Sequence, residues 1–168
     1  MVGEVTEGAT LDPEAGPLQA LATPGHTPDH FAYYLADAAA IFCGDLMMGG
    51  MDTALVALPE GDLQHYLESL ETLRRLQPRI IYPAHGEPFE DPAAAIDTYV
   101  QHRRERVQQV VTALSGDSAT AEELVDQIYG PTLDERLRAY AREAIEAYLM
   151  FLKDGERVRQ SGSEWSLI

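Results

Sequence analysis

Short runs of apolar, β-prone residues, separated by turns rich in proline and glycine, occupy most of the first 90 positions. Such runs predict strands. After Asp62, apolar residues recur at spacings of three and four, which is typical of an amphipathic helix with that aspartate as its N-cap. The predicted strands are Leu18–Ala22, Phe31–Leu35, Ala40–Cys43 and Arg79–Tyr82, with the helix between the last two.

The pattern becomes helical after residue 90 and ends in a turn-rich, β-prone stretch. N-cap residues and terminal glycines predict three helices, and the last stretch predicts a β-hairpin. Three helices followed by a hairpin is the order of a winged helix-turn-helix, which we expect from about Val107 to Ile168. The predicted N-caps are Asp91, Ser118 or Thr120, and Asp134; the predicted ends are Gly116, Gly130 and Gly155; the hairpin strands are Arg157–Gln160 and Glu164–Ile168.

The apolar faces of these helices predict the core of the winged helix, closed by Trp165 on the hairpin. The third helix also places Tyr140 on its predicted inner face. The chain as a whole therefore reads as an α+β protein with one domain over residues 1–90 and a second over 91–168. The expected core residues are Leu124, Ile128, Leu137, Ile145 and Leu149.

The net charge of the chain disfavours some kinds of binding partner. The 168 residues contain 12 Lys and Arg against 28 Asp and Glu, a formal net charge of −16. This balance disfavours nonspecific binding to nucleic acid or to an anionic membrane, because both require positive surface. The single cysteine, Cys43, excludes an intrachain disulfide and a zinc site built from several thiolates. The sequence has no apolar run long enough to span a membrane, and its first residues do not resemble a signal peptide. We therefore expect a cytoplasmic protein.

Three loops that follow predicted strands carry side chains able to bind a metal. They are Thr23–His30, Cys43–Asp45 and Tyr82–Gly86, with His26, Asp45 and His85 as the candidate ligands. Imidazole and carboxylate are the usual zinc donors where thiolates are absent, and proline and glycine hold such loops close to a small ligand. Each loop taken alone is more typical of an ordinary turn, and only the three together leave both interpretations open.

The strings TPGHT, GD and PAHG, in this order and at these separations, resemble the second half of the metallo-β-lactamase superfamily over roughly residues 1–90. The helical tail is similar to the winged-helix domain of β-lactamase-like-2 type hydrolases. The resemblance implies the second half of an αββα sandwich followed by a winged helix, and a metal-dependent hydrolase with Zn²⁺ as cofactor.

The same resemblance implies a role for individual residues. His26 would bind a first metal, His85 a second, and Asp45 would bridge both, which makes Asp45 the residue most important for catalysis. A bridging carboxylate offsets the repulsion between two dications, and two metals generate a hydroxide nucleophile at neutral pH. We expect a structural or supporting role for His30, and solvated surface positions for His65 and His102.

One motif of the family has no counterpart in this sequence, which contains no His-x-His. The family's His-x-His-x-Asp-His motif supplies the remaining metal ligands from the first half of the fold. Since catalytic zinc takes three protein ligands and one open position, we expect at most one weakly bound Zn²⁺ and no hydrolysis by this chain alone.

A half sandwich would also leave one apolar sheet face in water. Apolar patches of that size are uncommon on monomers. We therefore expect either a homo-oligomer or association with a missing N-terminal half, with the contact near Phe31–Leu35 and Ala40–Cys43.

Three classes of function follow. The first is a metal-dependent hydrolase, with a small acyl or thioester-type substrate preferred over a nucleic acid. The alternative is a non-catalytic association module that uses the winged helix to bind a protein. A DNA-binding winged helix ranks last, because the third helix, 134–153, carries four basic and four acidic side chains rather than a basic stripe.

Overall fold

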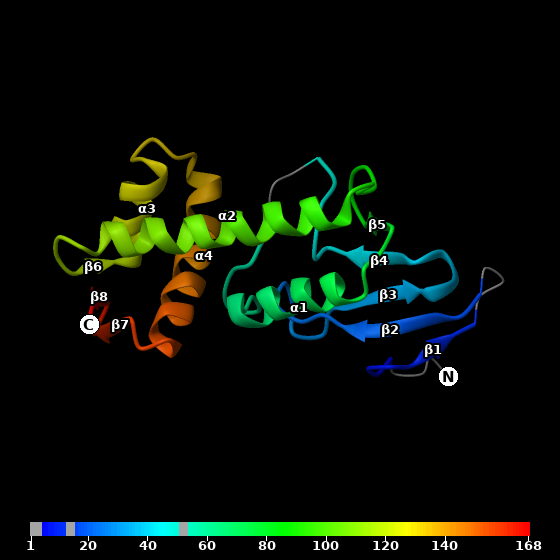
Figure 1. Ribbon diagram of the computed structural model, residues 1–168. Coiled ribbons are helices and arrows are strands. Elements are labelled where there is room, and N and C mark those ends of the chain that lie inside the picture. The colour runs from blue at the N-terminus through cyan, green and yellow to red at the C-terminus, as the bar shows by residue number, and fades with distance from the viewer. Residues whose placement is uncertain (1–4, 13–15, 51–53) are drawn as a thin grey trace.

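The computed structural model describes residues 5–12, 16–50 and 54–168, and it divides into two parts that lie side by side (Figure 1). One is a mixed sheet with a helix packed against it, and the other is a helical part that ends in a small sheet. Helix α2 (Pro92–Ala113) runs along both parts and packs against α1, α3 and α4. Within the described ranges, no helix is both long and apolar enough to cross a membrane.

Five strands form the larger sheet in their sequence order. The first four are antiparallel neighbours, and the fifth pairs with the fourth in parallel. Helix α1 (Leu63–Arg75) makes the crossover that a parallel connection requires. All four predicted strands are present, while the two-residue β1 was not foreseen because so short a strand has no readable alternation. The strands are β1 Thr10–Leu11, β2 Leu18–Ala22, β3 Phe31–Leu35, β4 Ala40–Gly44 and β5 Ile80–Pro83.

The start of α1 agrees with the sequence. Asp62 is its N-cap, and the carboxylate accepts a hydrogen bond from the His65 backbone N–H at 2.8 Å. The apolar stripe of the helix, which includes Tyr66, Leu70 and Leu73, is buried in the common core. That core is continuous with the inner face of the sheet, whose buried members are Leu21, Ala32, Ile41, Cys43 and Ile81.

The outer face of the sheet is also apolar. Phe42 and Tyr82 alternate with buried neighbours along β4 and β5, so they project from the side opposite the core. They are 41% and 36% exposed, and their rings stack at 5.3 Å between centroids. Tyr33 pairs with Phe42 in register, so three aromatic side chains form one row across three strands. A second in-register row consists of Leu35, Ala40 and Ile80.

The C-terminal part has the element order of a winged helix. Two helices follow α2, and the closing hairpin pairs with a short strand to give the order β6–β8–β7. Asp91 and Asp134 cap their helices as predicted, and Thr120 rather than Ser118 caps α3, in a reciprocal capping box with Glu123. The elements are β6 Ala119–Thr120, α3 Ala121–Tyr129, α4 Glu135–Asp154, β7 Val158–Ser161 and β8 Glu164–Leu167.

The predicted core of this part is correct except at the beginning of α4. Leu124, Ile145, Leu149 and Trp165 are buried, and Ile128 is partly buried against them. The prediction of an inward position is wrong for two residues: Leu137 is 55% exposed and Tyr140 is 56% exposed. In these first turns the contact with α3 is made by Arg138, which forms ion pairs with Glu122 and Asp126 at 2.6 Å. Periodicity shows which side of a helix is apolar, but not whether another element covers it.

The two leucines of α4 provide a direct test of this arrangement. Leu149→Ala, at a fully buried position, should lower the free energy of unfolding by about 2–5 kcal/mol because it leaves a cavity. Leu137→Ala on the same helix should change it by no more than about 0.5 kcal/mol, since its side chain is in water. Urea unfolding followed by circular dichroism measures both, and equal losses would contradict the described burial of α4.

Candidate metal site

The parallel pair β4 and β5 brings two of the three candidate ligands together. Asp45 follows β4 and His85 follows β5, so both leave the same edge of the sheet. His85 Nε2 lies 3.5 Å from Asp45 Oδ1. The loops are held by backbone hydrogen bonds, from Ala84 N–H to the Gly44 carbonyl and from Gly49 N–H to the His85 carbonyl, at 3.0 and 2.8 Å.

Gly86 is required by this close approach. Its φ is +85°, and a Cβ added there would lie 2.0 Å from the Gly49 carbonyl oxygen. Any other residue would collide with backbone and push the His85 loop away from the Asp45 loop. The glycine in PAHG therefore has a steric function in placing His85 beside Asp45.

The third candidate, His26, is held by helix α1 rather than by the parallel strands. Gly25 has a φ of +128°, and a Cβ there would lie 2.3 Å from the Tyr66 backbone nitrogen, so this loop lies directly on α1. Asp62 N–H donates to the Gly25 carbonyl at 2.9 Å, and Ser69 Oγ donates to the Pro24 carbonyl at 2.7 Å. The loop backbone is therefore fixed by groups of a rigid helix.

The ring of His26 is oriented by a backbone carbonyl. Its Nδ1 lies 2.7 Å from the Leu55 oxygen. A carbonyl only accepts, so Nδ1 carries a proton, and in the neutral imidazole the lone pair is then on Nε2. Metal-ligating histidines typically donate their other ring N–H in this way, because the bond fixes both tautomer and ring orientation.

His30 connects two of the loops. The Asp45 backbone N–H donates to its Nε2 at 3.2 Å, so Nδ1 carries the proton and donates to Thr23 Oγ1 at 2.8 Å. Burial lowers the pKa of His30, with a further lowering from His26, which favours this neutral form. Gly44 leaves room for the ring, since a Cβ there would lie 2.7 Å from Nε2. Both ring nitrogens are bonded to protein groups, in agreement with the supporting role expected for His30.

The donor chemistry of the Asp45–His85 pair fits a divalent cation. Asp45 Oδ1 is buried and accepts no hydrogen bond from the described residues, although its neighbour His85 faces it. A buried carboxylate oxygen without a donor is costly unless a cation or another partner satisfies it. Within the described ranges, however, no three His, Cys, Asp or Glu side chains gather in a metal-binding group. The His26 ring lies beside that of His30, at 6.3 Å between ring centroids, and the assignment of all three residues as ligands stays a prediction.

The remaining candidates are distributed as follows. His65 is exposed on α1 as expected, with Nδ1 3.3 Å from Asp62 Oδ2. His102 lies on α2 with intermediate exposure. Cys43 is fully buried, and burial raises the pKa of its thiol to about 12, which keeps it protonated.

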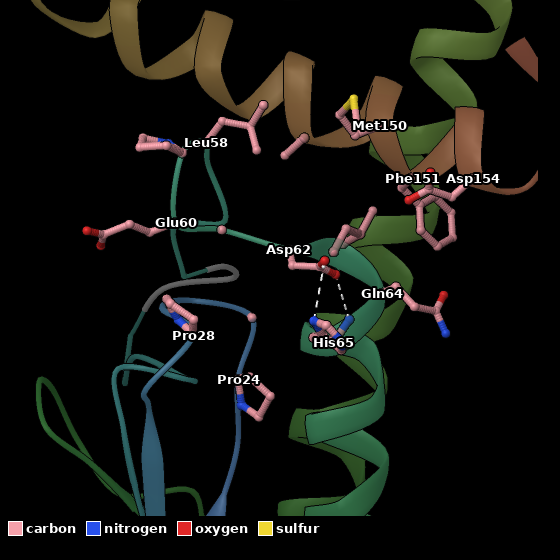
Figure 2. A pocket seen from close by; sticks show the side chains of 15 residues that line it. Pro24, Pro28, Leu58, Glu60, Asp62, Gln64, His65, Met150, Phe151 and Asp154 are labelled. Carbon is pink, nitrogen blue, oxygen red and sulfur yellow. Dashed lines mark hydrogen bonds and ion pairs between the residues drawn. The ribbon is translucent and has the colours of Figure 1, made fainter. Parts of the chain in front are cut away.

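A cavity of about 530 Å³ lies between the two parts of the molecule, beside the loop that carries His26 (Figure 2). None of the three candidate ligands lines it. Its walls come from that loop, the segment before α1, the first turn of α1 and the last turns of α4, and its charged rim is acidic. This chemistry suits a neutral or cationic group with an apolar portion. The polar lining residues are Glu60, Asp62, Gln64, His65 and Asp154, and apolar ones include Leu58, Leu63, Met150 and Phe151.

The sequence interpretation missed Arg103, which is buried in the middle of α2. It lies within the charged run Gln101–Arg106, a composition typical of a solvated helix face. Its position was nevertheless readable, because it continues the inward helical spacing of Ile96, Tyr99, Val107 and Val110. A charged residue on an apolar stripe indicates a buried polar contact.

Known protein families match both parts of the chain. Residues 1–85 match the family described as "Metallo-beta-lactamase superfamily", and residues 120–165 match "Beta-lactamase associated winged helix domain". The chain belongs to the metallo-beta-lactamase superfamily and carries the associated winged helix. Its fold is α+β, as the resemblance implied, and its structural neighbours have the metallo-beta-lactamase fold.

Two relatives illustrate the similarity in sequence. The beta-lactamase-like protein 2 homolog of Caenorhabditis elegans is 31% identical over 126 residues, covering 74% of this chain and 41% of the relative. The atrochrysone carboxyl ACP thioesterase of Passalora fulva is 32% identical over 173 residues, covering 95% and 50%. The chain thus spans about half the length of these curated relatives.

Two crystal structures share the fold over nearly all of this chain. A beta-lactamase domain protein from Burkholderia ambifaria superposes with a TM-score of 0.89 at 20% identity, covering 99% of this chain and 52% of that one. A metallo-beta-lactamase family protein from Thermus thermophilus gives 0.84 at 24% identity, covering 98% and 54%.

The hydrogen bond between Thr23 and His30 can be tested by a nearly isosteric change. Thr23→Val removes the hydroxyl that accepts from His30 Nδ1 in a buried position, and should cost about 1–3 kcal/mol of unfolding free energy. The control Thr27→Val removes an exposed hydroxyl that bonds Asp29, and should cost no more than about 0.5 kcal/mol. Chemical denaturation measures both, and indistinguishable midpoints would refute the supporting role of this bond.

Proposed function

We propose that this chain is the C-terminal half of a metal-dependent hydrolase that cleaves a small acyl or thioester-type substrate. The observation that carries the proposal is the placement of Asp45 and His85 at the carboxyl ends of two parallel strands, with Asp45 Oδ1 unpartnered among the described residues. The thioesterase name of the Passalora fulva relative supports the substrate class.

In this proposal some residues of the chain bind the metal, and others hold those ligands in position. His26 offers Nε2, His85 offers Nε2 and Asp45 offers its carboxylate to zinc. His30 holds the backbone of Asp45, and the Leu55 carbonyl holds the His26 ring. Zinc, when bound, supplies a hydroxide nucleophile at neutral pH and stabilises the leaving group.

The number of metal ligands that the chain supplies limits the activity proposed for the isolated chain. His26, Asp45 and His85 would together give neither of two metals the three protein ligands of a catalytic zinc. We therefore propose that the isolated chain holds at most one zinc ion, weakly, and is inactive. Activity requires a half-domain that carries His-x-His-x-Asp-His.

The outer face of the sheet is the proposed contact with that half. It carries two in-register apolar rows, and the exposed pair Phe42–Tyr82 lies in one of them. Beside this pair is a groove of about 580 Å³ that includes Leu35, Arg79 and Glu90, so the face offers charges at its margin as well as apolar area. In the isolated chain, we propose that a second copy buries the same face.

One observation favours the alternative, a non-catalytic association module. Leu137 and Tyr140 expose apolar area on the winged helix, where a protein partner could bind. A role in reading DNA has less support, because the second half of α4, including Tyr148 and Leu149, is buried in the common core.

Complementation tests the hydrolase proposal. The chain is co-expressed with a half-domain bearing His-x-His-x-Asp-His, and zinc content and cleavage of S-acyl thioesters are measured with a thiol reagent. We expect the complex to retain zinc and to hydrolyse the thioester, with the separate chain inactive. Asp45→Ala should lower kcat/KM by more than about 100-fold, above the 10–100-fold typical of groups that only support a ligand.

His65→Ala is the matched control for this experiment, because His65 is exposed and faces Asp62 on its own helix rather than the proposed ligands. It should leave kcat/KM unchanged. Full activity of the Asp45→Ala complex would overturn the site, and chelator-sensitive hydrolysis by the isolated chain would overturn the requirement for a second half.

The mass of the isolated chain tests the proposed contact face. Light scattering at micromolar concentration should show a dimer, and Phe42→Glu should convert it to a monomer by placing a charge within the apolar row. Leu137→Glu alters an exposed apolar position on α4 and should leave the dimer intact. The opposite pattern would favour the association module built on the winged helix.

A further inference from the structure

Arg103 is a buried cation at the point where the two parts of the molecule meet. Its side chain is 3% exposed, on the inward stripe of α2. Nη1 donates to Tyr148 Oη on α4 at 2.7 Å, and Nη2 donates to the Ala54 carbonyl. The guanidinium carbon lies 5.1 Å from the centroid of the Tyr66 ring on α1, within the range of a cation–π interaction. One side chain therefore connects three helices with the segment that precedes α1.

That segment also orients His26. Ala54 accepts from Arg103, and the next residue, Leu55, accepts from His26 Nδ1. Three residues further, Leu58 N–H donates to the Glu143 carbonyl on α4 at 3.3 Å. The segment Ala54–Leu58, whose Leu55 carbonyl orients the His26 ring, is thus bonded at one end to Arg103 and at the other to the winged helix.

The described contacts of the His26 ring include the hydrogen bond to the Leu55 carbonyl and an edge contact with the His30 ring, at 6.3 Å between ring centroids. The Leu55 side chain is exposed, so packing at that residue contributes little to the position of its carbonyl. The neighbouring bond from Arg103 enters a buried, low-dielectric environment, where a charge-assisted hydrogen bond is strong. The Ala54 and Leu55 carbonyls belong to consecutive peptide planes that meet at the Leu55 Cα, so holding the Ala54 carbonyl restricts the backbone from which the Leu55 carbonyl projects.

We propose that Arg103 is a positioning residue for His26, and that Tyr148 makes the winged helix part of that support. Arg103 fixes the Ala54–Leu55 peptide, the Leu55 carbonyl fixes the Nδ1–H tautomer of His26, and Nε2 is left free for a metal. The metal-binding part of this inference rests on the proposed function, whereas the link from Arg103 to the His26 ring concerns the metal-free protein.

The tautomer of His26 is the primary readout. Long-range ¹H–¹⁵N spectra of the metal-free chain should show His26 as the Nδ1–H form. In Arg103→Gln we expect a mixture with the Nε2–H form, because the carbonyl is no longer held. Tyr148→Phe keeps the ring in the core and removes one acceptor, so it should shift the mixture in the same direction by less, and it decides the question if Arg103→Gln does not fold.

Two further variants separate positioning from general stability. Arg103→Lys should keep the wild-type tautomer, since an ammonium group can lie over Tyr66 and donate to the Ala54 carbonyl. Arg138→Gln breaks the ion pairs between α3 and α4, away from the segment before α1, and should also leave the His26 tautomer unchanged. A wild-type tautomer in folded Arg103→Gln and Tyr148→Phe would overturn the proposal.

Zinc titration of the same variants distinguishes this inference from the proposed function. Arg103→Gln should weaken zinc binding by about 10-fold, the lower range for loss of a group that supports a ligand, while Arg103→Lys should not. A changed tautomer together with no zinc binding by any form, including the complemented protein, would refute the proposed function and leave the positioning role of Arg103 standing. An unchanged tautomer with normal zinc binding would refute the positioning role alone.

Discussion

The parallel ladder between β4 and β5 brings the two strands' carboxyl ends to one edge of the sheet, and the arrangement of the site depends on it. Asp45 and His85 are 40 positions apart in the chain, yet Asp45 Oδ1 and His85 Nε2 lie 3.5 Å apart. The ladder is possible because α1 makes a crossover long enough to return the chain in the same direction. The close packing of Gly49 against Gly86 then sets the distance between the two loops.

The remaining parts of the site are held mainly through backbone groups. The His26 loop is attached to α1, the His30 ring connects its own loop to the Asp45 backbone, and the Leu55 carbonyl orients His26. Side chains supported by backbone bonds keep their orientation before a ligand arrives, which lowers the cost of binding. Through Arg103, this network extends to the winged helix, so that the second part of the molecule has a physical connection to the first.

One face of the five-stranded sheet is buried in the core. The opposite face carries two rows of apolar side chains. The core face is closed by α1 and α2, whereas Phe42 and Tyr82 stack on the other side with more than a third of their surface exposed. Both crystal structures that share the fold are about twice as long as this chain. In the proposed function, association through the outer face and completion of the ligand set are linked, because one partner half would both cover this face and supply ligands.

Local signals in the sequence were sufficient for the helices, for the longer strands and for the family. Each of these signals extends over only a few residues and can be recognised without knowledge of the fold. They are the helix caps Asp62, Asp91 and Asp134, the apolar alternation of the strands, and the sequence strings around His26, Asp45 and His85. The exposure of Leu137 and the role of Arg103 were decided only by tertiary structure. Whether an apolar face is covered, and what a buried charge meets, depends on elements far away in the chain, and periodicity along one helix carries no information about them.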